Sequence, residues 1–193
     1  GRNTFRFYSE SMNRDAAAHL QLRTGLRRAL AQGELFLEYQ PQVELVSGRV
    51  IGAEALVRWQ HPQRGLVPPM QFIPFAEQTG FVRHLTLWMF EEVARLLADP
   101  RTQGLPLRVS VNLSTRDLLD PELSHRLADI LVRHGVAASA FCLEITESAI
   151  MDDPQRAEAM LNRLSEQGFK LSIDDFGTGY SSLAYLKIGR AHV

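Results

Sequence analysis

Four apolar segments of the sequence each end on or near a carboxylate or a carboxamide. These residues are Glu54, Asn112, Glu144 and the adjacent pair Asp174 and Asp175. If the carboxylates lie close together they repel one another, and one or more must bind a proton unless a cation is present. A divalent cation removes this penalty. An all-oxygen ligand set that includes the neutral amide of Asn112 favours Mg²⁺ or Mn²⁺ over zinc.

The two adjacent aspartates add a geometric constraint. In a regular strand the side chains of Asp174 and Asp175 would point to opposite faces, so both reach one site only where the strand ends. Gly177 and Gly179 favour an end at that point. Two neighbouring carboxylates can serve two cations about 3.5–4 Å apart, which is the arrangement for in-line phosphoryl chemistry. We therefore predict a two-metal site with Glu54, Asp174 and Asp175 as catalytic carboxylates.

Other polar residues are weaker candidates. Arg58 follows Glu54 near a strand end, where a phosphate could reach it, although a lone arginine is usually solvated. A single strand-end acid is more often a helix cap or an ion-pair partner, Asn112 could be a turn residue, and Glu147 could belong to a loop. The histidines show no paired metal-ligand spacing, and Cys142 is typical of a small core residue.

The segments that must position these side chains alternate between strand and helix patterns. Strands are expected within 1–10 and over 35–39, 50–57, 108–113, 141–146 and 170–174, with Pro41 ending the strand over 35–39. Helices are expected over 12–31, 72–80, 85–98, 121–134 and 154–167. Such alternation is typical of a parallel α/β sheet, either open or closed into a barrel. In closed barrels the active site lies at the carboxyl ends of the strands, where these polar residues fall.

Composition narrows the classes of partner. The chain has 193 residues, a formal net charge of −1 and one cysteine. A net charge this small gives no long-range attraction to DNA, RNA or an acidic membrane, so an anionic ligand must be held by local cations. A single cysteine excludes an internal disulfide and fits a reducing compartment. No apolar run approaches the roughly 20 residues that span a bilayer, so we expect a cytoplasmic domain whose parent protein could be anchored by upstream segments.

Several ordered segments resemble the EAL domain family of cyclic di-GMP phosphodiesterases. They are Tyr39-Gln40-Pro41, Gly52-Ala53-Glu54-Ala55-Leu56-Val57-Arg58-Trp59, Phe72-Ile73-Pro74-Phe75-Ala76-Glu77, Val111-Asn112-Leu113-Ser114, Leu143-Glu144-Ile145-Thr146-Glu147-Ser148 and the run from Asp174 to Leu183. The resemblance implies hydrolysis of cyclic di-GMP to linear pGpG with Mg²⁺ or Mn²⁺. The implied fold is an α/β, TIM-like (β/α)8 barrel with an antiparallel first strand, of which about five of eight strands would be present here.

The resemblance also assigns roles to individual residues. The metal ligands of the family are matched by Glu54, Asn112, Glu144 and Asp174, and its second-site aspartate by Asp175. Arg58 corresponds to a substrate-phosphate contact, and Gln40 to a further substrate contact. Glu147 matches the glutamate that orders the loop 176–182. In the family this loop couples metal binding to dimerisation, so a homodimer is expected.

Segments outside the EAL-like region 33–187 indicate a longer parent protein. Residues 1–10 resemble the end of a GGDEF (diguanylate cyclase-type) domain, and 11–32 are typical of a linker helix, so a GGDEF domain in cis is expected. Residues 188–193 do not resemble the family and match a translated sequencing adapter, with a natural divergent terminus as the alternative. The family continues with further strands that carry an active-site lysine and glutamate. Without them we expect the polypeptide as written to be unstable and inactive.

Two other functions stay open at this point. A non-catalytic cyclic di-GMP receptor on the same fold is disfavoured by the intact ligand residues named above, and the lysine and glutamate that the family carries after position 187 would discriminate it from an enzyme. An unrelated Mg²⁺ barrel, such as a lyase, would share the strand-end carboxylates but not the run from Asp174 to Leu183.

Overall fold

The computed structural model describes residues 25–102 and 107–174. The strand expected within residues 1–10, most of the helix expected over 12–31, and residues 175–193 lie outside these ranges. Residues 25–32 are helical, and Gly33 follows with a φ of 68°. Glycine adopts this left-handed conformation without strain and commonly ends helices for that reason. The predicted end of this helix near Gly33 is therefore confirmed.

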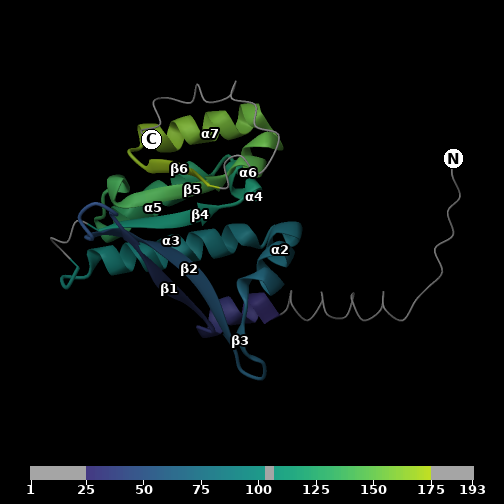
Figure 1. The fold of residues 1–193 in the computed structure, drawn as a ribbon. Helices are drawn as coiled ribbons and strands as arrows, with labels where there is room; N and C mark the ends of the chain where they lie inside the picture. Colours follow the sequence, from purple (N-terminus) through teal and green to yellow (C-terminus); the bar gives the residue numbers. More distant parts are fainter. Residues whose placement is uncertain (1–24, 103–106, 175–193) are drawn as a thin grey trace, which may run out of the picture.

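One sheet runs through the molecule in the order β1-β2-β4-β5-β6 (Figure 1). Its strands are β1 (Leu35–Val43), β2 (Val50–His61), β4 (Arg108–Leu113), β5 (Phe141–Thr146) and β6 (Lys170–Asp174). β1 is antiparallel to β2, whereas β2, β4, β5 and β6 run parallel. The expected parallel sheet with an antiparallel first strand is confirmed, and β4, β5 and β6 have their predicted bounds.

The first two strands are longer than predicted. Pro41 does not end β1, which continues to Val43. Among the described strands, β1 pairs only with β2 and so lies at the edge of the sheet. An edge strand tolerates proline because the backbone N–H groups on its free side need no partner in a neighbouring strand. β2 continues past Val57 to His61, where the short strand β3 (Gly65–Val67) pairs with its end. Three residues are too few to show a strand periodicity, so β3 was not predicted.

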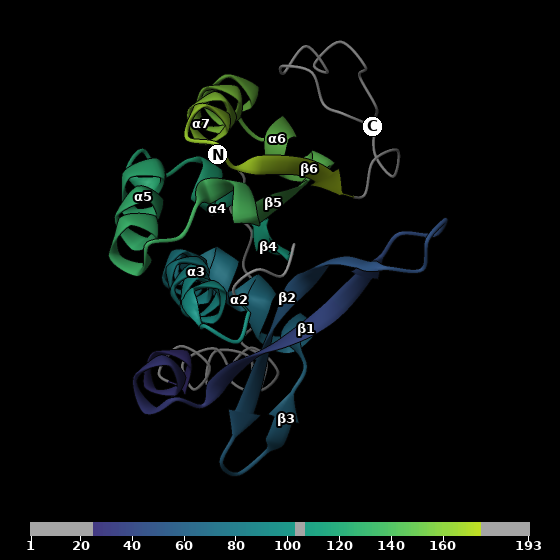
Figure 2. The same cartoon turned by 90° about the vertical axis from the view of Figure 1, so that its left-hand side faces the viewer.

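Helices cover one face of this sheet (Figure 2). They are α2 (Pro69–Thr79), α3 (Val82–Ala98), α4 (Thr115–Leu118), α5 (Leu123–His134), α6 (Glu147–Met151) and α7 (Pro154–Glu166), with a 3₁₀ turn, η1, at Ala138–Ala140. α2 begins earlier than predicted because Pro69 is well suited to the first turn of a helix. The short helices α4 and α6 were not predicted. They are capped by the hydroxyls of Ser114 and Thr146, which accept hydrogen bonds from backbone N–H groups.

Each parallel strand buries one face against the helices. In β4, Val109 and Val111 are buried, whereas Asn112 between Val111 and Leu113 is exposed. In β5, Phe141 is fully buried and stacks on Phe90 of α3, with 5.1 Å between the ring centroids. Side chains alternate between the two faces of a strand, so the polar residues of interest lie on the face away from the helices. This is the arrangement of a barrel wall, with helices outside and polar side chains inside.

Candidate metal centre

Strand register brings the predicted site residues onto the face of the sheet that lies away from the helices, here called the inner face. The pairs across the sheet are Gln40 with Glu54, Glu54 with Ser110, Asn112 with Glu144, and Thr146 with Asp174. Ser110 and Asn112 are two residues apart, as are Glu144 and Thr146, so all of these side chains share one face. Strands β1, β2, β4, β5 and β6 thus contribute to one row of polar side chains.

Hydrogen bonds join the members of this row across the strands. Asn112 Nδ2 donates to Glu54 Oε1 over 2.8 Å and so links β4 to β2. Gln42 Nε2, on β1, donates to Ser110 Oγ at 3.2 Å and to Glu144 Oε1 at 3.3 Å. Glu54 therefore receives a donor from the neighbouring strand β4, whereas Glu144 on β5 receives one from β1, which is not its neighbour in the sheet.

The charges of the row act on one another. Partial burial raises the pKa of Glu144, and the hydrogen bond from Ser110 opposes that rise. The negative charges of Glu54 and Asp174 raise the pKa of Glu144 further, while the hydrogen bond from Gln42 lowers it. The carboxylates from β2, β5 and β6 are therefore close enough for mutual repulsion, which is the electrostatic situation that a divalent cation relieves.

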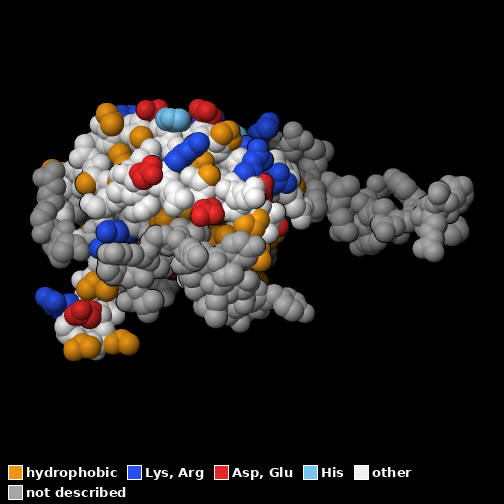
Figure 3. Space-filling model, turned by 90° about the horizontal axis from the view of Figure 1, so that it is seen from above, with side chains coloured by type: hydrophobic (Ala, Val, Ile, Leu, Met, Phe, Trp, Pro, Cys, Tyr) orange, Lys and Arg blue, Asp and Glu red, His pale blue; other side chains and the backbone are white. Residues whose placement is uncertain are grey.

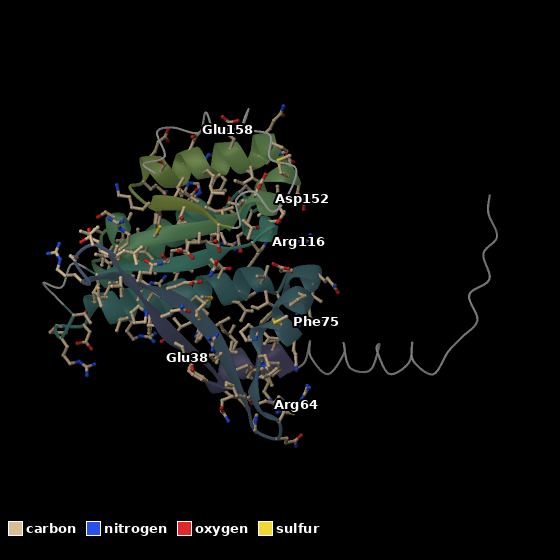
Figure 4. All side chains as sticks on the ribbon, in the orientation of Figure 1. Glu38, Arg64, Phe75, Arg116, Asp152 and Glu158 are labelled. Atoms are coloured by element: carbon tan, nitrogen blue, oxygen red, sulfur yellow. The ribbon has the colours of Figure 1, made fainter. Side chains whose placement is uncertain are left out.

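Arg58 lies on the inner face nearer the carboxyl end of β2. Its Nε donates to Glu38 Oε2 on β1 over 2.7 Å, and its Nη1 donates to the carbonyl oxygen of Val57 over 3.0 Å. Glu38, labelled in Figure 4, lies in the N-terminal half of β1 and is more exposed than Arg58. Arg58 is thus held by two acceptors, on the same face as the acidic row and along the same strand as Glu54.

The remaining predicted residues are placed only in part. Gln40 is exposed on β1 directly opposite Glu54, and its contact with a substrate stays a prediction. Glu147 is not in a loop, because it opens the short helix α6 directly after β5. Asp175 and the loop 176–182 lie outside the described residues, so the second-site aspartate and the loop role of Glu147 stay predictions.

The residues of the inner face fit a hard divalent cation. The atoms that would coordinate the cation are the carboxylate oxygens of Glu54, Glu144 and Asp174 and the amide oxygen of Asn112. This is an all-oxygen set of the kind that Mg²⁺ and Mn²⁺ prefer. Within residues 25–102 and 107–174, no three acidic, histidine or cysteine side chains enclose a cation by themselves. The predicted ligand set therefore includes the amide of Asn112 in addition to the acids.

Gln42 and Ser110 were missed by the sequence analysis. Both precede or follow a predicted site residue by two positions on the same strand, Gln42 after Gln40 and Ser110 before Asn112. The period-two rule of strands could have found them, because residues i and i+2 line one face. Their residue types alone did not indicate a functional site, because neutral amides and hydroxyls are common on any strand.

Known proteins resemble this chain in sequence and in structure. The sequence matches the EAL domain over residues 23–188. It is 43% identical over 188 residues to the bifunctional diguanylate cyclase/cyclic di-GMP phosphodiesterase MucR of Pseudomonas aeruginosa, covering 97% of this chain and 27% of the relative. It is 39% identical over 186 residues to the cyclic di-GMP phosphodiesterase PdeR of Escherichia coli, covering 96% and 28%. The chain therefore spans about a quarter of the length of these curated relatives.

Solved structures show the same likeness. A MucR phosphodiesterase structure in complex with cyclic di-GMP superposes with a TM-score of 0.82 at 43% identity, covering 87% of this chain and 68% of the other. The EAL enzyme Bd1971, in a cGMP-bound form, superposes with a TM-score of 0.80 at 32% identity, covering 91% and 50%. The match in sequence, the antiparallel first strand and the inner acidic row agree, and the chain belongs to the EAL domain family.

Proposed function

We propose that the protein carrying this chain is a divalent-metal-dependent phosphodiesterase that hydrolyses cyclic di-GMP to linear pGpG. The observation that supports this most strongly is the row on the inner face, in which Glu54 and Asp174 act electrostatically on Glu144 and Asn112 on β4 donates to Glu54 on β2. The relatives MucR and PdeR, which carry cyclic di-GMP phosphodiesterase names, support the choice of substrate.

The residues divide into two roles in this proposal. Glu54, Asn112, Glu144, Asp174 and Asp175 would hold two cations, Mg²⁺ or Mn²⁺. When bound, these cations supply an activated water and neutralise charge on the phosphate. Asn112 fixes the carboxylate of Glu54 through its 2.8 Å hydrogen bond, so that this ligand is oriented before the cation arrives.

Substrate contacts are assigned to the rim of the same face. Arg58 presents a guanidinium that a phosphate can share with Glu38, and a planar guanidinium suits phosphate oxygens because it offers paired donors. Gln40, exposed opposite Glu54, would contribute an amide to the bound nucleotide. The acidic row repels a phosphate unless cations are present, so metal and substrate binding are expected to be cooperative.

The setting of this domain is also proposed. The name of MucR pairs a diguanylate cyclase with a phosphodiesterase, which supports a GGDEF domain in cis ahead of residue 25. We propose a homodimer coupled to the metal site through Glu147 and the loop 176–182, and a cytoplasmic location.

Among the described residues, no helix has the length and apolarity to cross a membrane. Among the described residues on the surface seen from above, basic and acidic side chains are both present (Figure 3).

Hydrolysis by the full-length protein tests the proposal. Purified protein is incubated with cyclic di-GMP and Mn²⁺ or Mg²⁺, and pGpG is measured by chromatography. Wild type should form pGpG, chelator should stop it, and Glu54→Gln should lower turnover by at least about 100-fold, since a direct ligand matters more than its supporting residues. Glu158→Gln, the same change on the exposed surface of α7 (labelled in Figure 4), should leave turnover unchanged. Tight binding of cyclic di-GMP without hydrolysis would contradict the proposal and indicate a receptor.

A further inference from the structure

Gln42 on β1 contacts strands that are not its neighbours. Its backbone pairs with Gly52 of β2, and Gly52 in turn pairs with Arg108 of β4. The Gln42 side chain nevertheless reaches Ser110 on β4 and Glu144 on β5, donating from Nε2 to both. The side chain therefore lies across β2 on the inner face, with its amide N–H group directed at the acidic row.

Gly52 is what permits this path. A Cβ at position 52 would lie 3.1 Å from Gln42 Oε1 and 2.6 Å from the carbonyl oxygen of Arg108. The second distance is shorter than real Cβ contacts, so any side chain at this position would push β2 away from β4 as well as crowd the amide of Gln42. The absence of a side chain at Gly52 thus serves both the close strand pairing and the passage of Gln42.

The contact between Gln42 and Glu144 directs a hydrogen-bond donor at a carboxylate that lies among other negative charges. Glu144 stands between the charges of Glu54 and Asp174, which favour rotation of its carboxylate away from them. The amide of Gln42 binds one carboxylate oxygen of Glu144, and the buried hydroxyl of Ser110, 1% exposed, takes part in the same cluster. A carboxylate held from one side by protein donors keeps a single orientation, which lowers the entropy lost when it binds a cation.

We propose that Gln42 is a positioning residue of the metal centre: its side chain, passing over Gly52, fixes the carboxylate of Glu144 for cation binding. This rests on the proposed function, because it takes Glu144 as a metal ligand. Gln42 itself is not a ligand in this arrangement. Its nitrogen, which cannot coordinate a cation, is the atom that faces the row.

Metal binding to the full-length protein tests the inference without relying on turnover. Free Mn²⁺ is titrated by electron paramagnetic resonance for wild type, Gln42→Met and Gln42→Asn. Methionine keeps the length of the side chain but has no hydrogen-bond donor. Asparagine keeps the amide donor but is one methylene shorter, so it cannot reach Glu144. Both variants should bind Mn²⁺ about 10-fold more weakly, the usual effect of losing a supporting hydrogen bond to a ligand. Gln155→Met, on the exposed surface of α7, is the matched control and should bind as wild type does.

Three further measurements separate the explanations. Glu144→Gln is titrated alongside: if it weakens Mn²⁺ binding and the Gln42 variants bind within twofold of wild type, the positioning role is wrong and the metal centre stands. If neither Glu144→Gln nor Gln42→Met changes Mn²⁺ affinity, both proposals fail. The thermal midpoint without metal is recorded for each variant, and raised Mn²⁺ should restore turnover of Gln42→Met, which a global loss of structure would not allow.

Discussion

Asn112 and Glu54 are joined side chain to side chain across the parallel pair β4 and β2, with Nδ2 of the amide 2.8 Å from Oε1 of the carboxylate. In sequence they are 58 positions apart. The bond directs a donor at one of the acids that repel each other on the inner face. It stabilises the row before any cation binds, and it suggests how each of the two residues will respond to substitution.

Asn112→Asp replaces this donor by another carboxylate. We expect the metal-free protein to lose about 1 kcal/mol of its free energy of unfolding, because a hydrogen bond becomes a repulsive contact at a partly solvated site. Added Mn²⁺ should return much of that loss, since the cation neutralises the new charge. Urea unfolding with and without Mn²⁺ measures both effects. Asn162→Asp on the exposed surface of α7 should show neither loss nor rescue.

Glu38→Gln alters the surroundings of Arg58 without touching the acidic row. The substitution removes the carboxylate that accepts from Arg58 Nε at 2.7 Å and leaves a neutral amide in its place. We expect cyclic di-GMP to bind about 3-fold more tightly at low salt, because one negative charge near a phosphate contact is lost in a largely solvated setting. Equilibrium binding in a chelating buffer measures this. Arg58→Gln should weaken binding, and a gain from Glu38→Gln that persists at high salt would contradict the electrostatic explanation.

Much of this fold was predictable because its signals are local. The apolar runs around Val109, Leu143 and Ile173 predicted β4, β5 and β6 with their observed bounds, since a strand buried on its helix side is marked by every second residue. Pro41 was misleading: proline interrupts a central strand, and only the sheet order shows that β1 lies at an edge. Asn112, Glu144 and Asp174 could be named from their positions at or near strand ends, whereas Glu54 lies within β2, which continues to His61. The spacing from Gln40 could have placed Gln42 on the same face, but its contact with Glu144 could not be predicted, because that contact depends on a path across Gly52.

Asp117 gives the protein a pH dependence that is separate from the metal centre. It is fully buried, and burial raises the pKa of its carboxyl, although Ser114 and Thr86 donate hydrogen bonds to Oδ2. Oδ1 has no hydrogen-bond partner among the described residues. A carboxyl with a raised pKa in the folded state binds its proton more tightly there than in the unfolded chain. Its contribution to stability is therefore present below the unfolded pKa, near 3.9, and is lost as the pH rises through the folded pKa.

Asp117→Asn isolates this contribution, because asparagine resembles the protonated carboxyl. We expect the free energy of unfolding of the variant, relative to wild type, to increase from pH 5 to pH 7.5, because rising pH removes the stabilising contribution of the buried wild-type carboxyl and does not affect the amide. Urea unfolding at both pH values measures it. Asp152→Asn, an exposed acid after α6 (labelled in Figure 4), controls for the general effect of removing a charge. Equal differences between variant and wild type at the two pH values would show that Asp117 does not titrate in this range.

Trp59→Phe tests the link between the helix over 25–32 and the sheet. Trp59 Nε1 donates to Glu34 Oε2 over 3.0 Å, and Arg28 Nε donates to the other oxygen of the same carboxylate over 3.0 Å. Phenylalanine keeps most of the apolar packing and removes one donor from a largely buried charge, so we expect a loss of about 1–3 kcal/mol in the free energy of unfolding. Trp88→Phe on α3, at a partly exposed position, should cost less. Each single variant leaves the Glu34 carboxylate with one of its two donors. The double variant Arg28→Met with Trp59→Phe removes both, so its loss in free energy of unfolding should exceed the sum of the two single losses. Strict additivity in urea unfolding would mean that the two donors stabilise Glu34 independently.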